Sequence, residues 1–282
     1  MVKIGIAQML VVNDKQANID NGCSMIEEAA GAGCEMVVLP EMFNCPYDPS
    51  LFHEYAEEYP DGHTIKSLAE AAARNGVFVV GGSIPERDGN TGLVYNTSFV
   101  FNPDGSMIAR HRKVHLFDVD LDTGLSFKES DLIAPGDEIT LFDTPFGKVG
   151  VLICYDIRFP EFLTAMVLEG ATMVVVPAAF NTTTGPAHWE ILFRARAVDN
   201  QVYIVGAAPA YNPDIKYNCY GHSILVDPWG RIEKQADNSQ QLLFCDMDPS
   251  KVMRIRKQLP QLKHRRRDIY EILLKRNLSS KM

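Results

Sequence analysis

The sequence predicts an α/β protein of one domain, in which two β-sheets lie back to back between outer layers of helices. Short runs of β-branched residues alternate with amphipathic stretches of helical period, as expected for layers of sheet and helix. Continuous apolar runs such as Met173–Val176 are typical of strands that are covered on both faces. Hairpin signals such as Asn102–Gly105 interrupt the alternation, which favours this four-layer α-β-β-α sandwich. A single doubly wound sheet is the alternative.

The individual strands are predicted from short runs rich in β-branched and aromatic residues between turn signals. These runs are Lys3–Met9, Met36–Leu39, Val77–Gly81, Tyr95–Phe101, Ser106–Arg112, Lys148–Ile153, Met173–Val176, Val202–Ala207, Ser223–Val226 and Leu242–Asp246. The helices are predicted from amphipathic stretches that end near glycine, as at Gly76 and Gly170, or begin with a first-turn proline, as at Pro186. These stretches are Asp14–Ala32, Thr64–Asn75, Phe159–Glu169, Pro186–Asp199 and Ser250–Lys257.

The chain shows no internal repeat, low-complexity tract or linker, and we therefore expect one domain. We assign residues 1–250 to this domain and residues 251–282 to a C-terminal segment that packs against it or contacts a second subunit. The least regular stretch, Phe117–Asp137, is long and polar for a loop, which points to function rather than scaffold.

The net charge of −9 and the pI of about 5.3 argue against nucleic-acid or membrane-surface partners. The one basic cluster, Lys263–Arg267, is interpreted as a solvated face or a subunit contact. No apolar stretch is long enough to span a bilayer, and the chain runs directly into its first strand without a signal peptide. The 6 cysteines show no metal-binding spacing. We expect a soluble cytoplasmic protein with free thiols and no metal.

Cys154 ends an apolar predicted strand and precedes a charged, proline-bearing stretch that opens a helix. On such a turn the sulfur should be exposed, and the positive end of the helix dipole should favour the thiolate. The alternative is a buried cysteine that packs as a small, inert apolar side chain.

Two further charged residues stand where predicted strands end, Glu41 after Met36–Leu39 and Lys113 after Ser106–Arg112. Reacting groups gather at strand ends because a rigid sheet aims them and loops can close over them. A partly desolvated glutamate can act as a base for a cysteine. Lys113 and the backbone N–H of Tyr155 could stabilise the oxyanion of an acyl transfer. Taken singly, each of these charged residues would more often be a surface group.

Three separated segments resemble, in order, the three signatures of the nitrilase superfamily of carbon–nitrogen hydrolases. These segments are Leu39–Phe43, Arg112–Phe117 and Cys154–Glu161. The resemblance extends from about residue 3 to about residue 250 and implies the α-β-β-α sandwich. It also implies a triad in which Glu41 is the base, Lys113 the oxyanion-binding lysine and Cys154 the nucleophile. Glu129 matches a second glutamate that members often carry, which would orient Lys113 or the substrate.

Further segments resemble particular branches of the superfamily. Cys154-Tyr155-Asp156 favours amidases, because true nitrilases have Cys-Trp-Glu and synthetase glutaminase domains Cys-Glu-Asp. Ala179–Glu190 is similar to omega-amidases, which hydrolyse the terminal amide of alpha-ketoglutaramate and alpha-ketosuccinamate, and Asn181 and Thr182 separate it from deaminated-glutathione amidases. Glu41–Tyr47 also resembles omega-amidases, although Met42 replaces the more usual cysteine. The run Thr182–Gly185 reads equally as a loop into a helix that a threonine caps.

The resemblance therefore implies hydrolysis of a small, carboxylate-bearing amide through a cysteine thioester, with ammonia released and no metal or organic cofactor. The substrate would lie against Tyr47, Tyr155, Phe180, Asn181 and Thr182. Alternatives are a deaminated-glutathione amidase, an N-carbamoyl amidohydrolase and a catalytically silent interaction scaffold.

Three further expectations concern residues that follow Cys154. Arg158 is expected to pair with a carboxylate such as Asp156 or Glu161 rather than with the substrate. The resemblance implies a homodimer that pairs through the helices flanking the nucleophile, and the apolar stretch Phe162–Leu168 could serve there or cover the sheet. His188 and Trp189 are expected to be scaffold rather than reactants.

Overall fold

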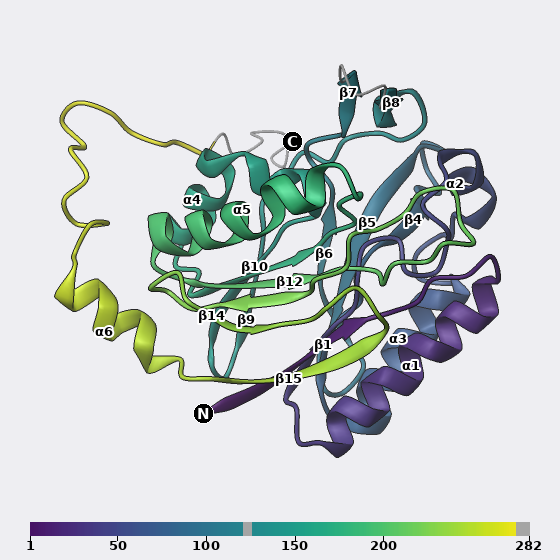
Figure 1. Ribbon diagram of the computed structural model, residues 1–282, viewed down its shortest axis with the longest axis horizontal. Helices are drawn as coiled ribbons and strands as arrows, with labels where there is room; N and C mark the ends of the chain where they lie inside the picture. Colours follow the sequence, from purple (N-terminus) through teal and green to yellow (C-terminus); the bar gives the residue numbers. More distant parts are fainter. Residues whose placement is uncertain (121–125, 275–282) are drawn as a thin grey trace.

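The computed structural model describes residues 1–120 and 126–274 and contains two mixed β-sheets between layers of helices (Figure 1). The first sheet has the strand order β15-β1-β2-β3-β5-β4, with β6 paired to β5, and the second has the order β14-β13-β12-β11-β10-β9. This arrangement confirms the four-layer sandwich and excludes the single doubly wound sheet.

The strands of the first sheet are β1 (Val2–Gln8), β2 (Met36–Val38), β3 (Phe78–Val80), β4 (Ile84–Arg87), β5 (Val94–Phe101), β6 (Met107–Arg112) and β15 (Gln241–Met247). The strands of the second sheet are β9 (Thr140–Thr144), β10 (Gly147–Val151), β11 (Met173–Pro177), β12 (Tyr203–Ala207), β13 (Ile224–Val226) and β14 (Ile232–Gln235). A separate hairpin pairs β7 (Asp118–Asp120) with β8 (Ser126–Lys128). The helices are α1 (Lys15–Gly31), α2 (Pro49–Tyr55), α3 (His63–Asn75), α4 (Pro160–Leu168), α5 (Thr184–Asn200) and α6 (Ser250–Gln258). Two short 3₁₀ helices are η1 (Glu129–Asp131) and η2 (Cys154–Arg158).

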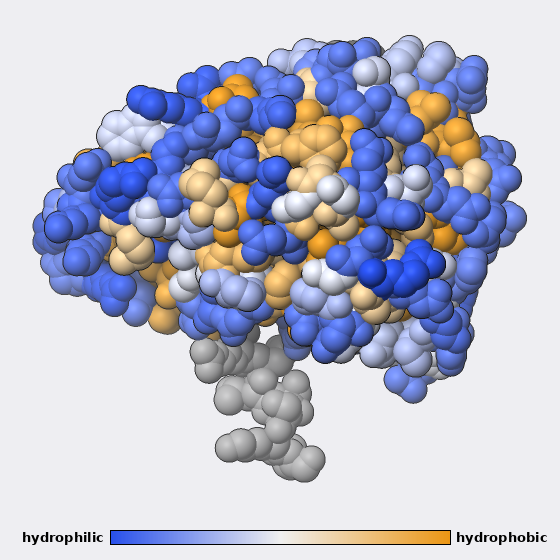
Figure 2. Space-filling model, turned by 90° about the horizontal axis from the view of Figure 1, so that it is seen from below, coloured by the Kyte–Doolittle hydropathy of each residue, from blue (hydrophilic) through white to orange (hydrophobic). Residues whose placement is uncertain are grey.

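The main core lies between the sheets, where Val38 of β2 and Val151 of β10 belong to one buried apolar cluster. Side chains of α3, such as Leu68, pack on the first sheet. Met166 of α4 and Phe193 of α5 pack on the second. Burial of such side chains is the main favourable term in folding, at roughly 25 cal/mol per Å² of apolar surface. Figure 2 shows apolar residues interspersed with polar ones on the face seen from below.

The predicted strands and helices are all present, with ends shifted by a few residues. Helix α2 and strands β4, β9 and β14 were not predicted, and the stretch predicted as a loop forms β7, β8 and η1. Strand β4, which contains Pro85, is the last strand in the order of the first sheet. A proline suits such an edge strand because it has no backbone N–H to donate to a neighbouring strand. None of the helices in the described ranges is long and apolar enough to cross a membrane. All 6 cysteines are free.

The predicted threonine cap of α5 is wrong. Thr183 makes no side-chain capping hydrogen bond. Instead, Oδ1 of Asn181 accepts hydrogen bonds from the backbone N–H groups of Thr183 and Thr184, at 3.0 and 2.8 Å. An asparagine oxygen satisfies these otherwise unpaired N–H groups as well as a threonine hydroxyl would.

Candidate active site

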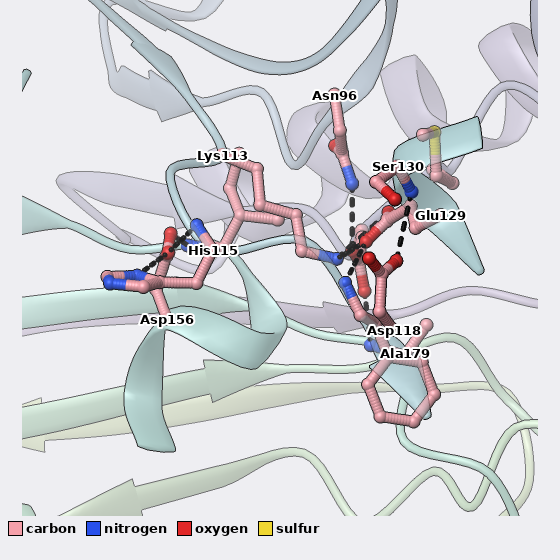
Figure 3. Close-up of polar contacts among 12 residues, drawn as sticks. Asn96, Lys113, His115, Asp118, Glu129, Ser130, Asp156 and Ala179 are labelled. Carbon is pink, nitrogen blue, oxygen red and sulfur yellow. Dashed lines mark hydrogen bonds and ion pairs between the residues drawn. The ribbon is translucent and has the colours of Figure 1, made fainter. Parts of the chain in front are cut away.

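Four elements deliver polar side chains to one buried place (Figure 3). Glu41 follows parallel strand β2, and Cys154 opens η2 shortly after β10 of the other sheet. Lys113 comes directly after β6, and Glu129 begins η1. The sandwich therefore brings together the ends of strands from both sheets. This convergence was expected from the sequence for Glu41, Lys113 and Cys154.

Lys113 lies between two carboxylates. Its Nζ atom is 3.1 Å from Oε1 of Glu41, and 3.0 and 2.9 Å from the two carboxylate oxygens of Glu129. All three side chains are fully buried. Burial alone would lower the pKa of Lys113, but the charges of Glu129 and Glu41 outweigh it and raise the pKa. The lysine therefore stays a cation, and the three groups together carry one negative charge when both carboxylates are ionised.

The second oxygen of Glu41 is also occupied. The backbone N–H of Ala179 donates to Oε2 at 2.8 Å, and Nδ2 of Asn96 donates to Oε1 at 2.8 Å. Burial raises the pKa of Glu41, although the charge of Lys113 acts in the opposite direction. A carboxyl group held in one orientation beside a thiol is suited to accept and return a proton.

Glu129 is held by the segment that sequence analysis read as an irregular loop. The backbone N–H of Phe117 donates to Oε2 at 2.7 Å, and the hydroxyl of Tyr47 donates to Oε1 at 3.4 Å. These contacts hold the carboxylate against Lys113.

Cys154 is buried, with an exposed fraction of 7%, and its φ angle of 47° lies in the left-handed region. Few residues other than glycine adopt this conformation, and it is common at functional turns. Burial and the negative charge of Glu41 raise the pKa of the Cys154 thiol well above its usual range. The expectation of an exposed, dipole-stabilised thiolate is therefore wrong, because desolvation and a neighbouring carboxylate outweigh the dipole of one short 3₁₀ helix. The thiol hydrogen-bonds to Glu41, which can act as its base.

A small cavity opens beside Cys154. Its walls are formed mainly by aromatic side chains, together with one guanidinium group. The lining residues are Tyr47, Phe117, Cys154, Tyr155, Arg158, Ala179, Phe180, Thr184 and Tyr217. The cavity thus places three of the predicted substrate-binding residues, Tyr47, Tyr155 and Phe180, next to the thiol.

The other two predicted substrate-binding residues lie differently. Asn181 is buried, caps α5 through its oxygen and is not among the residues that line the cavity. Thr182 is exposed and is not among the residues that line the cavity. Sequence reasoning missed Asn96 and Tyr217. An asparagine within an apolar strand is unusual, and that signal could have identified Asn96.

Arg158 does not have the predicted partner. Its guanidinium contacts Nδ1 of His188 at 3.3 Å and lies 5.0 Å from the ring centre of Phe180. Asp156 instead accepts hydrogen bonds from two histidines and two backbone N–H groups. The expected pairing of Arg158 with Asp156 or Glu161 is therefore wrong, since neither carboxylate pairs with this guanidinium in the described structure, and Arg158 lines the cavity.

No group of three or more His, Cys, Asp or Glu side chains that could hold a metal occurs among residues 1–120 and 126–274. The arrangement offers a thiol, a carboxylate base and a buried ammonium around one cavity. This combination suits attack by sulfur on a carbonyl carbon, with the ammonium near the developing oxyanion.

A family model for carbon-nitrogen hydrolases matches residues 3–257, and the chain belongs to this family. It is accordingly an enzyme of the class that hydrolyses carbon–nitrogen bonds, and the predicted membership of the nitrilase superfamily is confirmed. Among relatives, omega-amidase NIT2-A of Xenopus laevis is 46% identical over 98% of this chain and 99% of that protein. Omega-amidase NIT2 of Homo sapiens is 43% identical over 97% of this chain and 98% of that protein. The crystal structure of Nit3 of Saccharomyces cerevisiae, from branch 10 of the nitrilase superfamily, superposes with a TM-score of 0.87 at 41% identity, covering 94% of this chain and 96% of Nit3.

Proposed function

We propose that the protein is an omega-amidase-like hydrolase that releases ammonia from the terminal amide of a small carboxylate-bearing substrate. Alpha-ketoglutaramate and alpha-ketosuccinamate are the proposed substrates. The observation that carries this proposal is the buried cluster of Glu41, Lys113 and Glu129 beside the Cys154 thiol. The similarity to omega-amidases over nearly the whole chain supports the choice of substrate.

The first half-reaction forms a thioester. Glu41 takes the proton of Cys154 while the sulfur forms a bond to the amide carbon, and the carbonyl oxygen becomes an oxyanion. Lys113 and the backbone N–H of Tyr155 stabilise this oxyanion, because N–H groups in the first turn of a helix have no intrahelical partner. The carbon–nitrogen bond then breaks, and Glu41 gives its proton to the departing nitrogen, which leaves as ammonia.

The second half-reaction consumes water. Glu41 takes a proton from a water molecule, whose oxygen bonds to the thioester carbon. The carbon–sulfur bond breaks, the product leaves as a carboxylic acid, and Cys154 regains its proton. Oxidation states do not change, and the same carboxyl group serves as base and acid in both halves.

The cavity supports a substrate with a carboxylate at its far end. Arg158 is the cationic side chain among the lining residues, and Tyr47, Tyr155 and Phe180 would pack against the short carbon chain. Asn181 would act indirectly, through the cap that it places on α5, because it does not line the cavity. Thr182 would act only from the outer edge of the site, since it is exposed.

Cys154→Ala tests the mechanism and should abolish ammonia release in purified protein. A variant with ordinary turnover would contradict the thioester route. A panel of alpha-ketoglutaramate, deaminated glutathione and N-carbamoyl compounds tests the substrate. Preference for deaminated glutathione or for a carbamoyl compound would replace the omega-amidase proposal with the corresponding alternative. An interaction scaffold would turn over no amide and would show no selective iodoacetamide labelling of Cys154 at neutral pH.

Arg158→Gln tests the carboxylate-binding role. Loss of a charge-assisted contact costs roughly 1.5–3 kcal/mol, so kcat/KM for alpha-ketoglutaramate should fall about 10- to 150-fold. Turnover of butanamide, which has no carboxylate, should change little. Arg74→Gln is the matched control, because that guanidinium is exposed in the last turn of α3, away from the cavity and from α4 and α5. Equal losses with both amides would refute the proposed role.

We also propose a homodimer that pairs through α4 and α5. Helix α5 exposes Ile191 and Val198, with exposed fractions of 65% and 44%, which supports a partner on that face. Light scattering should give a dimer at micromolar concentration, and Ile191→Asp should shift it to a monomer. A monomeric wild type would contradict the proposal. We further propose that residues 1–250 form the hydrolase domain and that residues 251–282 form a C-terminal segment that packs against it or contacts the partner. We also propose a cytoplasmic location, which the free thiols support.

A further inference from the structure

Asp156 is a fully buried carboxylate outside the cavity, two residues after Cys154. It accepts four hydrogen bonds. The backbone N–H of Ile153 and Nε2 of His111 donate to Oδ2 at 3.0 and 3.2 Å. The backbone N–H and Nδ1 of His115 donate to Oδ1 at 2.9 and 2.7 Å. Both oxygens are thus fully occupied, and Asp156 has no free lone pair for a substrate.

The donors come from the two segments that carry the proposed oxyanion lysine and nucleophile. His111 and His115 flank Lys113 on either side, and His111 lies on β6 of the first sheet. Ile153 immediately precedes Cys154 and follows β10 of the second sheet. In Figure 3, Asp156 and His115 lie on one side of Lys113, while the lysine side chain extends away from them toward Glu129.

Asp156 also closes the turn that presents the sulfur. Its backbone N–H donates to the carbonyl oxygen of Ile153 at 3.0 Å, while its carboxylate accepts from the N–H of the same residue. Cys154 stands between these two residues with a φ angle of 47°. A non-glycine residue in this conformation costs roughly 1–3 kcal/mol and persists only where neighbouring contacts hold it.

We propose that Asp156 is a positioning residue that fixes the Cys154 turn and the Lys113 segment in one geometry through His111 and His115. This inference rests on the proposed chemistry of Cys154 and Lys113. The carboxylate touches neither substrate nor reacting atoms; it acts by setting the distance between the sulfur and the ammonium. Displacement by about 1 Å in such a site can cost on the order of 100-fold in rate.

Asp156→Asn tests the proposal, because an amide keeps the shape but replaces one acceptor oxygen with a donor that faces N–H groups. We expect kcat for alpha-ketoglutaramate to fall about 100-fold, with KM changed less than about threefold. Asp227→Asn is the matched control. Asp227 is equally buried and accepts two backbone N–H hydrogen bonds in the turn between β13 and β14, away from the site. This control should lose stability but keep kcat, and similar losses of kcat in both variants would overturn the proposal.

A pair of variants at His115 separates positioning from packing. His115→Asn keeps a side-chain N–H that can reach Asp156, whereas His115→Leu does not, and both lose the stacking of the imidazole on Phe159. We expect the leucine variant to lose at least tenfold in kcat and the asparagine variant to recover most of that loss. Equal kcat in the two variants would contradict the proposal.

The rate of Cys154 alkylation by iodoacetamide, followed by mass spectrometry, keeps this inference separate from the proposed function. The reaction needs the thiol aligned with Glu41 but needs no amide hydrolysis. If the wild type hydrolyses no amide, the proposed function fails. A rate at least tenfold lower in Asp156→Asn than in the wild type and in Asp227→Asn would still support positioning. Equal rates would overturn it.

Discussion

Glu129→Gln is the sharpest test of how the cluster works. The substitution keeps the size of the side chain but removes one of the two negative charges that face Lys113. Gln replaces one carboxylate oxygen with an NH₂ donor, so Lys113 loses one of the two oxygens that it contacts. The loss of one charge-assisted hydrogen bond is roughly 1.5–3 kcal/mol, which corresponds to a fall of about 10- to 150-fold in kcat/KM.

The same variant should also change the pH profile. Burial raises the pKa of Glu41, and the negative charge of Glu129 raises it further. Without that charge the pKa of Glu41 falls, so its basic form persists to lower pH. The acidic limb of kcat/KM should therefore move to lower pH.

Ammonia release from alpha-ketoglutaramate, measured across the pH range, gives both results in one experiment. Asp131→Asn is the control, because Asp131 lies on the same 3₁₀ helix and makes an exposed ion pair with Lys128, which contributes little. Far-ultraviolet circular dichroism confirms that both variants fold. If Glu129→Gln keeps kcat/KM within twofold of the wild type and an unmoved acidic limb, the proposed orientation of Lys113 by Glu129 is wrong.

Three further outcomes are expected. Gly82 has a φ angle of 55°, and a Cβ there would collide with the carbonyl oxygen of Pro40, so Gly82→Ala should displace Glu41 and lower kcat about 10- to 100-fold. Trp189 donates to the carbonyl oxygen of His222 at 2.7 Å, and Trp189→Phe should lower the free energy of unfolding in urea by roughly 1–3 kcal/mol while kcat is kept. Dialysis against EDTA should leave ammonia release unchanged, because side chains supply the proposed base, oxyanion donor and nucleophile.

The fold was predictable because its signals are local. Buried parallel strands such as β2 and β11 read as continuous apolar runs, and polar residues at strand ends stood out against them. The missed strands lack this contrast. Strand β14 (Ile-Glu-Lys-Gln) is mostly polar, and β4 contains a proline. Their pairing depends on neighbours in the sheet rather than on their own composition.

The environment of the site was not predictable in the same way. Two of the donors that hold Glu41, Asn96 and the N–H of Ala179, lie 55 and 138 residues away along the chain. The protonation state of Cys154 depends on the same tertiary contacts, because burial against Glu41 opposes the effect of its helix terminus. Local sequence can indicate which residue types meet at a site, but the folded packing sets their pKa values.

The charge count of the cluster explains why the thiol rests protonated. Glu41, Lys113 and Glu129 together carry one negative charge, and a thiolate on Cys154 would add a second in a buried site. Such a state is costly unless a new positive charge or dipole compensates it. Transfer of the thiol proton to Glu41 removes one negative charge as the sulfur gains one, so the net charge stays constant through the attack. In the proposed mechanism Glu129 remains as the ionised partner of Lys113 once Glu41 is neutral, which is why Glu129→Gln is expected to slow the reaction.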